Sequence, residues 1–152
     1  MSAPLPALLG LAWVYDQFEA RLAAAPVELK MIDRIDPANA NPEHIAHRGC
    51  VVDIPSTGNS GAYRDTDYAL VIDDVRVSLT YRIRPAEQRA SRGEAIALEE
   101  HIRAWLTDCR WGRDLRVAYA GTPVRGPHPK SAEFYLITQQ FATLRDATLG
   151  GV

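Results

Sequence analysis

The clearest pattern in the chain is an alternation of apolar and polar residues between positions 75 and 84. A period of two is typical of a β-strand, because successive side chains of a strand point to opposite faces of its sheet. One face would therefore be apolar, and the other would carry three arginines. Pro85 has no N–H to give a sheet ladder, so we expect the strand to end there. The apolar positions are Val75, Val77, Leu79, Tyr81 and Ile83, and the arginines are Arg76, Arg82 and Arg84.

An amphipathic helix is predicted shortly after this strand, with its start at Ser91. Ser91 and Glu94 have the spacing of a capping box, in which each side chain satisfies the other's backbone N–H. Apolar residues then recur at three- and four-residue steps, while charged residues, including Glu99, fall mainly off that stripe. The helix therefore has one face to bury, and the strand offers a face to bury it on. The stripe consists of Ala95, Leu98, Ile102, Trp105 or Leu106, and Cys109.

Another helix and a short strand are predicted before this central stretch. Residues 4–24 carry an apolar stripe at helical spacing that ends before Pro26, and Ser2 can cap the first turn. Residues 27–31 alternate between apolar and charged side chains, as a strand does. Residues 36–42 are rich in Pro, Asn and Asp and are predicted to form a loop. The helical stripe contains Leu8, Leu11, Val14 or Tyr15, Phe18 and Leu22.

The remaining segments complete a sheet. Strands are predicted at 50–54, 68–72, 115–119 and 133–144, with long loops at 55–67 and 121–130 that are rich in Gly, Pro and Ser. Asp73-Asp74 marks a bulge or a break before the central strand. The order of elements predicts an α+β fold, a mostly antiparallel β-sheet with two main helices packed on one face and long loops between strands. A length of 152 residues suits a single domain spanning residues 1–152.

Composition narrows the class of protein further. No apolar run is long enough to span a bilayer, and the N-terminal segment lacks the basic start of a signal peptide, so we expect no membrane partner. Cys50 and Cys109 are expected to be free thiols in a reducing cytoplasm. Residues 1–75 carry five basic and eleven acidic side chains, a net of −6, whereas residues 76–152 carry twelve and eight, a net of +4. This asymmetry either suits self-association between copies or reflects an ordinary solvated surface.

One grouping of potential metal ligands occurs at His44, His47 and Cys50, with Asp53 nearby. His and Cys at three-residue steps can reach one ion. However, a structural zinc site needs four ligands, and a strand starting at Cys50 would point Cys50 and His47 to opposite faces. The alternative is two surface histidines and a buried cysteine. We therefore expect neither a metal nor another cofactor.

No arrangement of residues predicts catalysis or strong nucleic-acid binding. His101 has no second histidine four residues away on its helix, so the metalloprotease pattern is absent. Cys109 falls on the apolar stripe, where a core role is expected rather than that of a nucleophile. Tyr81 lies on the face opposite the arginines and so is not interleaved with them as a base-stacking platform requires. We expect a protein that is not an enzyme and that makes at most weak, nonspecific contact with DNA.

The central stretch nevertheless resembles a known family. Residues 77–92, which form the strand and the polar turn, lead into residues 95–102 of the helix. This run resembles the strand-to-helix core of the tail terminator, or tail completion, proteins of long-tailed bacteriophages. The likeness covers about a third of the chain, and residues 33–64 depart from it as a longer segment. Related neck and completion proteins share the same pattern of strand, polar turn and capped helix.

The resemblance implies a structural virion protein without catalytic residues. Such proteins close into a ring, usually a hexamer, that caps the tail tube and provides the surface for joining the head connector or neck protein. The protein would be made in the host cytoplasm and end in the tail or neck of the virion. Alternatives are another phage neck or head-completion protein or, in a different class, a small metal-binding domain or enzyme around His44, His47 and Cys50. The residues we predict at the subunit interface are Arg76, Arg82, Arg84 and Arg89, met by Asp65 and Asp67.

Overall fold

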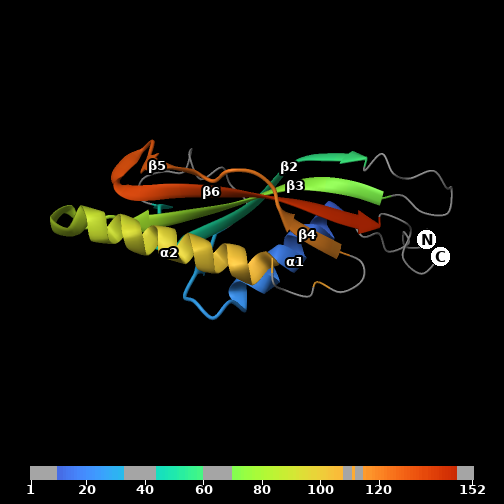
Figure 1. Cartoon of the computed structure of the whole chain (residues 1–152), viewed down its shortest axis with the longest axis horizontal. Helices are drawn as coiled ribbons and strands as arrows, with labels where there is room; N and C mark the ends of the chain where they lie inside the picture. The colour runs from blue at the N-terminus through green and yellow to red at the C-terminus, as the bar shows by residue number, and fades with distance from the viewer. Residues whose placement is uncertain (1–9, 33–43, 60–69, 108–110, 112–114, 147–152) are drawn as a thin grey trace, which may run out of the picture.

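The computed structural model describes residues 10–32, 44–59, 70–107, 111 and 115–146. In this part of the chain, two helices cover one face of a single curled sheet, and the predicted α+β class is confirmed. Figure 1 shows α2 lying along the sheet, with α1 beside it on the same face. The helices are α1 (Leu11–Ala23) and α2 (Gln88–Thr107), and a 3-10 turn, η3 (Pro85–Glu87), leads directly into α2.

The sheet is antiparallel except at one edge. Its order is β1-β2-β3-β6-β4, and β5 pairs with the part of β6 that β4 leaves open. Only β1 and β2 run parallel, through two residue pairs. The longest strands, β3 and β6, pair over their whole shared length and form the centre of the sheet. The strands are β1 (Lys30–Met31), β2 (Gly49–Asn59), β3 (Leu70–Arg82), β4 (Leu115–Tyr119), β5 (Val124–His128) and β6 (Ser131–Asp146).

The core lies between the helices and the apolar face of the sheet. The alternation predicted for the central strand is confirmed over Val75, Val77, Leu79 and Tyr81, which are buried and pair in register with β6. Ile83, the last residue of the predicted face, lies past the end of β3 and is partly exposed. The described residues of both helical stripes are buried against them, with Leu11 the exception at 41% exposure. Burying such side chains is the main source of stability, at roughly 1.5–3 kcal/mol each. The largest fully buried apolar side chains are Phe18, Phe141, Leu22, Leu79, Ile102, Leu106, Leu115 and Ile137.

Aromatic side chains join the two helices. The indole N–H of Trp105 on α2 donates to the carbonyl of Arg21 on α1 at 2.7 Å. The Arg21 guanidinium lies 4.7 Å from the centre of the same ring, a cation–π contact. The ring of Phe18 on α1 lies 4.8 Å from that of Trp111, which the Arg21 guanidinium also contacts at 5.8 Å. These contacts fix α1 against α2 and the sheet beneath them.

Two predicted loops are wrong in part, because pairing with a neighbouring strand outweighs local turn composition. β2 continues to Asn59 through Pro55, and a bulge between Asp53 and Ser56 accommodates the proline. Within the predicted loop 121–130, residues 124–128 form β5 on the edge of β6. Of the bulge or break predicted at Asp73-Asp74, there is no break, because β3 runs through both residues; the bulge in this pairing lies opposite, on β2. The predicted strands 115–119 and 133–144 are confirmed as β4 and as the body of β6.

The predicted helix starts are also wrong. α1 begins at Leu11 with Gly10 as its N-cap, and residues 4–9 of the predicted helix lie outside the described residues. α2 begins at Gln88 rather than Ser91. The Ser91 hydroxyl does not cap the helix: it donates to the Glu87 carbonyl at 2.8 Å and accepts from the Arg84 N–H at 3.1 Å. Ser91 therefore fastens η3 and the end of β3 to the first turn of α2.

Candidate functional site

The arginines predicted at an interface occupy two different surfaces. Arg76 and Arg82 lie on the face of β3 away from the helices, as the alternation predicts. Arg76 is 3.6 Å from Asp74 in a partly exposed ion pair. Arg82 is exposed, and its guanidinium lies 5.3 Å from the centre of the Phe134 ring. Arg89 is exposed on the first turn of α2, whereas Asp65 and Asp67 lie outside the described residues.

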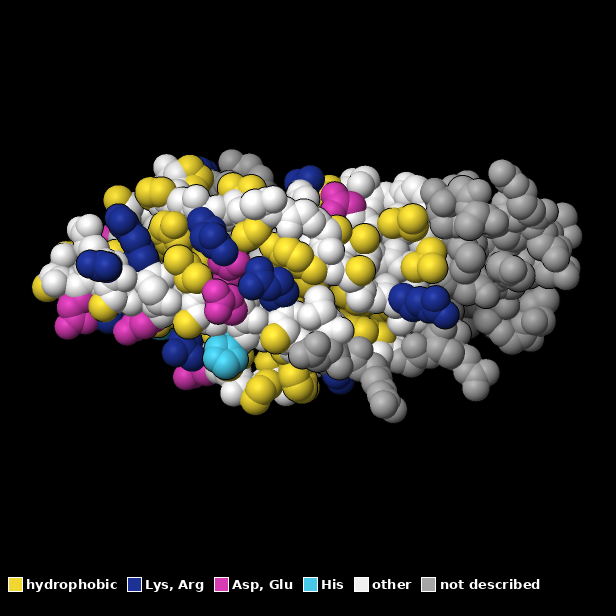
Figure 2. All heavy atoms as spheres, in the orientation of Figure 1, with side chains coloured by type: hydrophobic (Ala, Val, Ile, Leu, Met, Phe, Trp, Pro, Cys, Tyr) yellow, Lys and Arg dark blue, Asp and Glu magenta, His cyan; other side chains and the backbone are white. Residues whose placement is uncertain are grey.

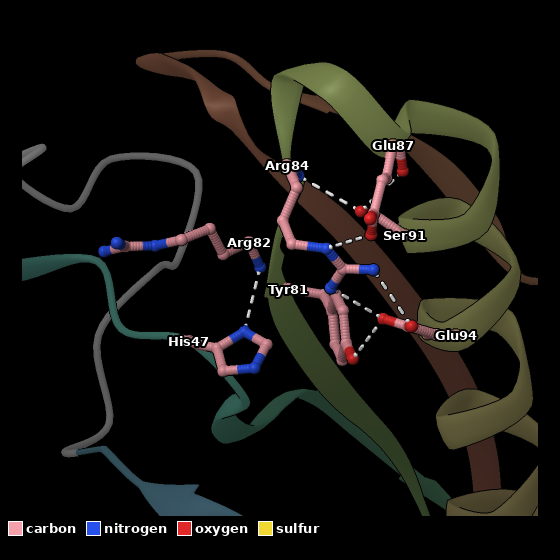
Figure 3. A network of polar contacts seen from close by, with 7 residues as sticks. All are labelled: His47, Tyr81, Arg82, Arg84, Glu87, Ser91 and Glu94. Atoms are coloured by element: carbon pink, nitrogen blue, oxygen red, sulfur yellow. Dashed lines mark hydrogen bonds and ion pairs between the residues drawn. The ribbon is translucent and has the colours of Figure 1, made fainter.

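Arg84 is the exception to the predicted face. β3 ends at Arg82, and the Arg84 side chain turns toward α2. It donates two hydrogen bonds of 3.0 Å to the Glu94 carboxylate and one of 2.8 Å to Glu87 (Figure 3). These bonds raise the pKa of Arg84. The pKa of Glu94 is lowered, and the largest cause is its hydrogen bonding to Arg84. Arg84 therefore serves to join β3 to α2 within the chain.

Tyr81 and His47 extend this polar network (Figure 3). The Tyr81 hydroxyl donates to Glu94 at 3.0 Å, and burial together with this bond raises the pKa of Tyr81. The His47 ring packs edge-on against Tyr81 with centroids 4.5 Å apart, and its Nδ1 accepts from the Arg82 N–H at 3.1 Å. Burial and the neighbouring arginines, Arg48 first, lower the pKa of His47. The neutral imidazole is thus the form that holds the residue 47 loop to the end of β3.

The turn that carries His47 is held in an unusual conformation. Arg48 has a φ of 56°, in the left-handed region that costs a non-glycine residue roughly 1–2 kcal/mol. Gly49 follows because a Cβ there would lie 2.6 Å from the Thr80 Oγ1 and 2.7 Å from the Ile32 Cδ1. The turn is fixed by the Gly49 N–H, which donates to the Ala46 carbonyl at 3.1 Å, and by the Thr80 hydroxyl, which donates to the same carbonyl at 2.7 Å.

A pocket of about 500 Å³ opens beside this turn. Its volume falls in the range typical of small-molecule sites, roughly 300–1,000 Å³. Polar groups from three parts of the chain converge on it above an apolar lining. The polar lining residues are Arg48, Tyr81, Glu94 and His101, and the apolar ones are Val27, Ala97 and Leu98.

A second ionic cluster joins α2 to the opposite edge of the sheet. The Glu99 carboxylate is fully buried and accepts two hydrogen bonds from Arg125 on β5, one of them at 2.8 Å. Arg103 lies 3.8 Å from the same carboxylate. The Gln139 side chain donates to the Glu99 carbonyl at 3.0 Å. Glu99 was predicted to lie off the buried stripe, and its burial follows from a strand, β5, that the local sequence pattern does not reveal.

The candidate metal ligands of the alternative reading do not form a cluster. Cys50 is buried in the core, where desolvation raises the pKa of its thiol to about 12. His44 and His47 are exposed, and the Nδ1 of His47 is already used as an acceptor. Within the described residues, no group of three or more His, Cys, Asp and Glu side chains could hold a metal ion. The predicted core position of Cys109, on the stripe of the second helix, lies outside the described residues.

We compared the chain with known protein families and with curated proteins. No family model matches the chain, and no curated protein matches it either. Among the helices of the described residues, neither has the length and apolar character needed to cross a membrane. What the chain does must therefore be argued from its surfaces and from the pattern of its central stretch.

Proposed function

We propose that this chain is a structural subunit of a bacteriophage tail, a tail terminator that closes into a ring, caps the tail tube and offers a surface to the head connector. Two lines of support meet here. The strand, polar turn and helix of residues 77–102 resemble the core of that family. The described fold is α+β, with one strand-to-helix unit, β3 to α2, at its centre.

The observation that carries the proposal is the long hairpin formed by β2 and β3. Figure 1 shows these strands continuing past the end of α2, together with β6. This end is stiffened from within, because the fully buried Asp73 carboxylate accepts from Arg145 on β6 at 2.7 Å and from the Thr57 hydroxyl on β2. Ring proteins of the resembled kind contact tube and connector through loops and hairpins. A hairpin whose far end is held rigid by pairing with β6 suits that task.

The charged surface supports association between copies. Charged side chains of both signs gather over the half of the molecule that α2 covers (Figure 2). Arg82, Arg89 and Arg92 are exposed at the end where β3 meets α2. Because the two halves of the sequence carry net charges of −6 and +4, a head-to-tail interface can pair the basic surface of one copy with an acidic surface of the next. Such an interface closes into a ring when its rotation allows.

The test is the mass in solution by light scattering, with negative-stain images of the same sample. We expect a closed ring of about six subunits. Purified tube subunits should then polymerise to limited lengths in its presence. Tubes of unlimited length would exclude a terminator, and a ring that binds connector but not tube would favour the head-completion alternative.

A further inference from the structure

We propose that the pocket beside Arg48 is a binding site for a carboxylate that carries a short apolar group. This inference goes beyond the assembly role and does not depend on it, since it rests on the pocket alone. The pocket combines one cationic donor in a strained backbone, a histidine and an apolar lining. Each of these features selects for a part of the ligand.

The strained backbone at Arg48 is the first argument. Among the described residues, Arg48 is the only non-glycine residue with a positive φ. Strain of this kind persists only where the surrounding structure enforces it, and it gathers at binding sites. Here the Arg48 carbonyl accepts from the Lys30 N–H at 2.9 Å, and the next residue is pinned by Ala46. A glycine at position 48 would remove the strain. The presence of arginine there therefore points to a use for its side chain.

The second argument is that no carboxylate of the described residues forms an ion pair with Arg48. Its guanidinium reaches the Glu28 carbonyl at 3.5 Å, the outer limit of a hydrogen bond, and contacts the Tyr81 hydroxyl. Glu94 lines the same pocket and its charge attracts Arg48, but its two oxygens accept hydrogen bonds from Arg84 and Tyr81 rather than from Arg48. A guanidinium has five N–H donors, so Arg48 retains capacity for a planar acceptor.

The chemistry of the lining defines the ligand. A carboxylate can pair with the flat guanidinium through two bonds, and His101 can add a donor from α2. A doubly charged phosphate would suffer more repulsion from Glu94 than a singly charged carboxylate. Val27, Ala97 and Leu98 would cover an apolar group attached to the carboxylate. An aliphatic acid of four to six carbons, or an acidic segment with an apolar neighbour, has about this size and character.

The test follows amide shifts by NMR during titration with 4-methylpentanoate. Its amide, 4-methylpentanamide, has nearly the same shape without the charge, and acetate has the charge without the branched group. We expect saturable shifts around residues 48 and 101 with 4-methylpentanoate, several-fold weaker binding of acetate and no binding of the amide. Equal binding of the acid and the amide would overturn the proposal.

Two variants separate the site from the fold. Arg48→Gly should weaken binding at least tenfold without lowering the unfolding temperature, because glycine accepts the left-handed conformation. Ala97→Glu should weaken it by a similar factor through repulsion, whereas Ala104→Glu adds the same charge at an exposed position two turns further along α2. Unchanged binding in both Arg48→Gly and Ala97→Glu would refute the site.

The source of the carboxylate is decided by repeating light scattering with saturating 4-methylpentanoate and with sodium chloride at the same ionic strength. If the acid alone dissociates assembled copies, the natural ligand is a carboxylate on a neighbouring copy. If the assembly is unaffected while the acid binds, the natural ligand is a separate molecule. A failure of the ring proposal would appear as a monomer at all concentrations, whereas a failure of this inference would appear in the titrations.

Discussion

The buried pair of Asp73 and Arg145 gives the sharpest prediction for stability. The Asp73 side chain is fully buried, and that of Arg145 is 7% exposed. The carboxylate accepts from Arg145 at 2.7 and 3.4 Å and from the hydroxyls of Thr57 and Thr143. Asp73→Ala would remove the carboxylate that pairs with Arg145 inside the protein, a change that costs about 3–5 kcal/mol of unfolding free energy. For a chain of this size, this corresponds to a fall of roughly 6–20 °C in Tm.

The neighbouring residue supplies a matched control. Asp74 pairs with Arg76 at 3.6 Å, with side chains that are 34% and 43% exposed. A surface pair of this kind contributes about 0–1 kcal/mol, so Asp74→Ala should be nearly silent. Replacing both partners of the buried pair, as Asp73→Ala with Arg145→Leu, should recover most of the loss, because an apolar pair leaves no charge unpaired.

Urea unfolding followed by tryptophan fluorescence and by circular dichroism measures five proteins: the wild type, Asp73→Ala, Asp74→Ala, Arg145→Leu and the double variant. Coincident transitions from the two probes establish two-state behaviour, which the free energies require. The double-mutant cycle then isolates the coupling between the two side chains. If Asp73→Ala loses no more than Asp74→Ala, or if the double variant is as unstable as the single one, the pair does not brace the hairpin as we infer.

Three further predictions concern the end of the molecule where β3 meets α2. Arg82→Glu should prevent ring formation and leave the urea midpoint of unfolding unchanged. Arg84→Glu should lower that midpoint, because it places a third carboxylate beside those of Glu87 and Glu94. Equal midpoints for the two variants would contradict this distinction. His47 has a lowered pKa when folded, so its contribution to stability is complete above the unfolded value of about 6.5 and is lost as the pH falls below it; unfolding curves at pH 7.5 and 5.5 should differ less in His47→Gln. Cys50, with a thiol pKa of about 12, should react with a thiol reagent only at the rate of unfolding. Fast labelling of the native protein at Cys50, told apart from Cys109 by peptide mapping, would show that Cys50 is accessible.

Periodicity was enough to predict the parts of the fold that depend on burial of one face. The alternation around Val77 and the stripe around Ile102 each require one buried side, and both are buried as predicted. β4 matches its predicted bounds because apolar and polar residues alternate along its whole length. In these segments the local pattern and the tertiary packing favour the same structure.

Elements whose structure depends on a distant partner were missed for a common reason. β5 contains Gly126 and Pro127, residues that favour turns, and it exists because β6 offers an open edge. The spacing of Ser91 and Glu94 matches a capping box, yet both side chains are used by Arg84. No local pattern identifies Arg84 as this partner. Arg84 precedes α2 in the chain, and its side chain reaches the helix only because η3 turns the chain between them.

The pairing of Arg84 within the chain also changes which arginines are expected at the subunit interface. Sequence alternation groups Arg76, Arg82 and Arg84 as one charged face, but a charge already paired within the chain has little left to offer a partner. Arg84 is held by two carboxylates and Arg76 by one, whereas Arg82 contacts only an aromatic ring among the described residues. A ring interface driven by charge would therefore depend on Arg82 and on Arg89 of the first helical turn. Substitutions at these two positions, rather than along the whole arginine series, are the ones that should separate assembly from folding.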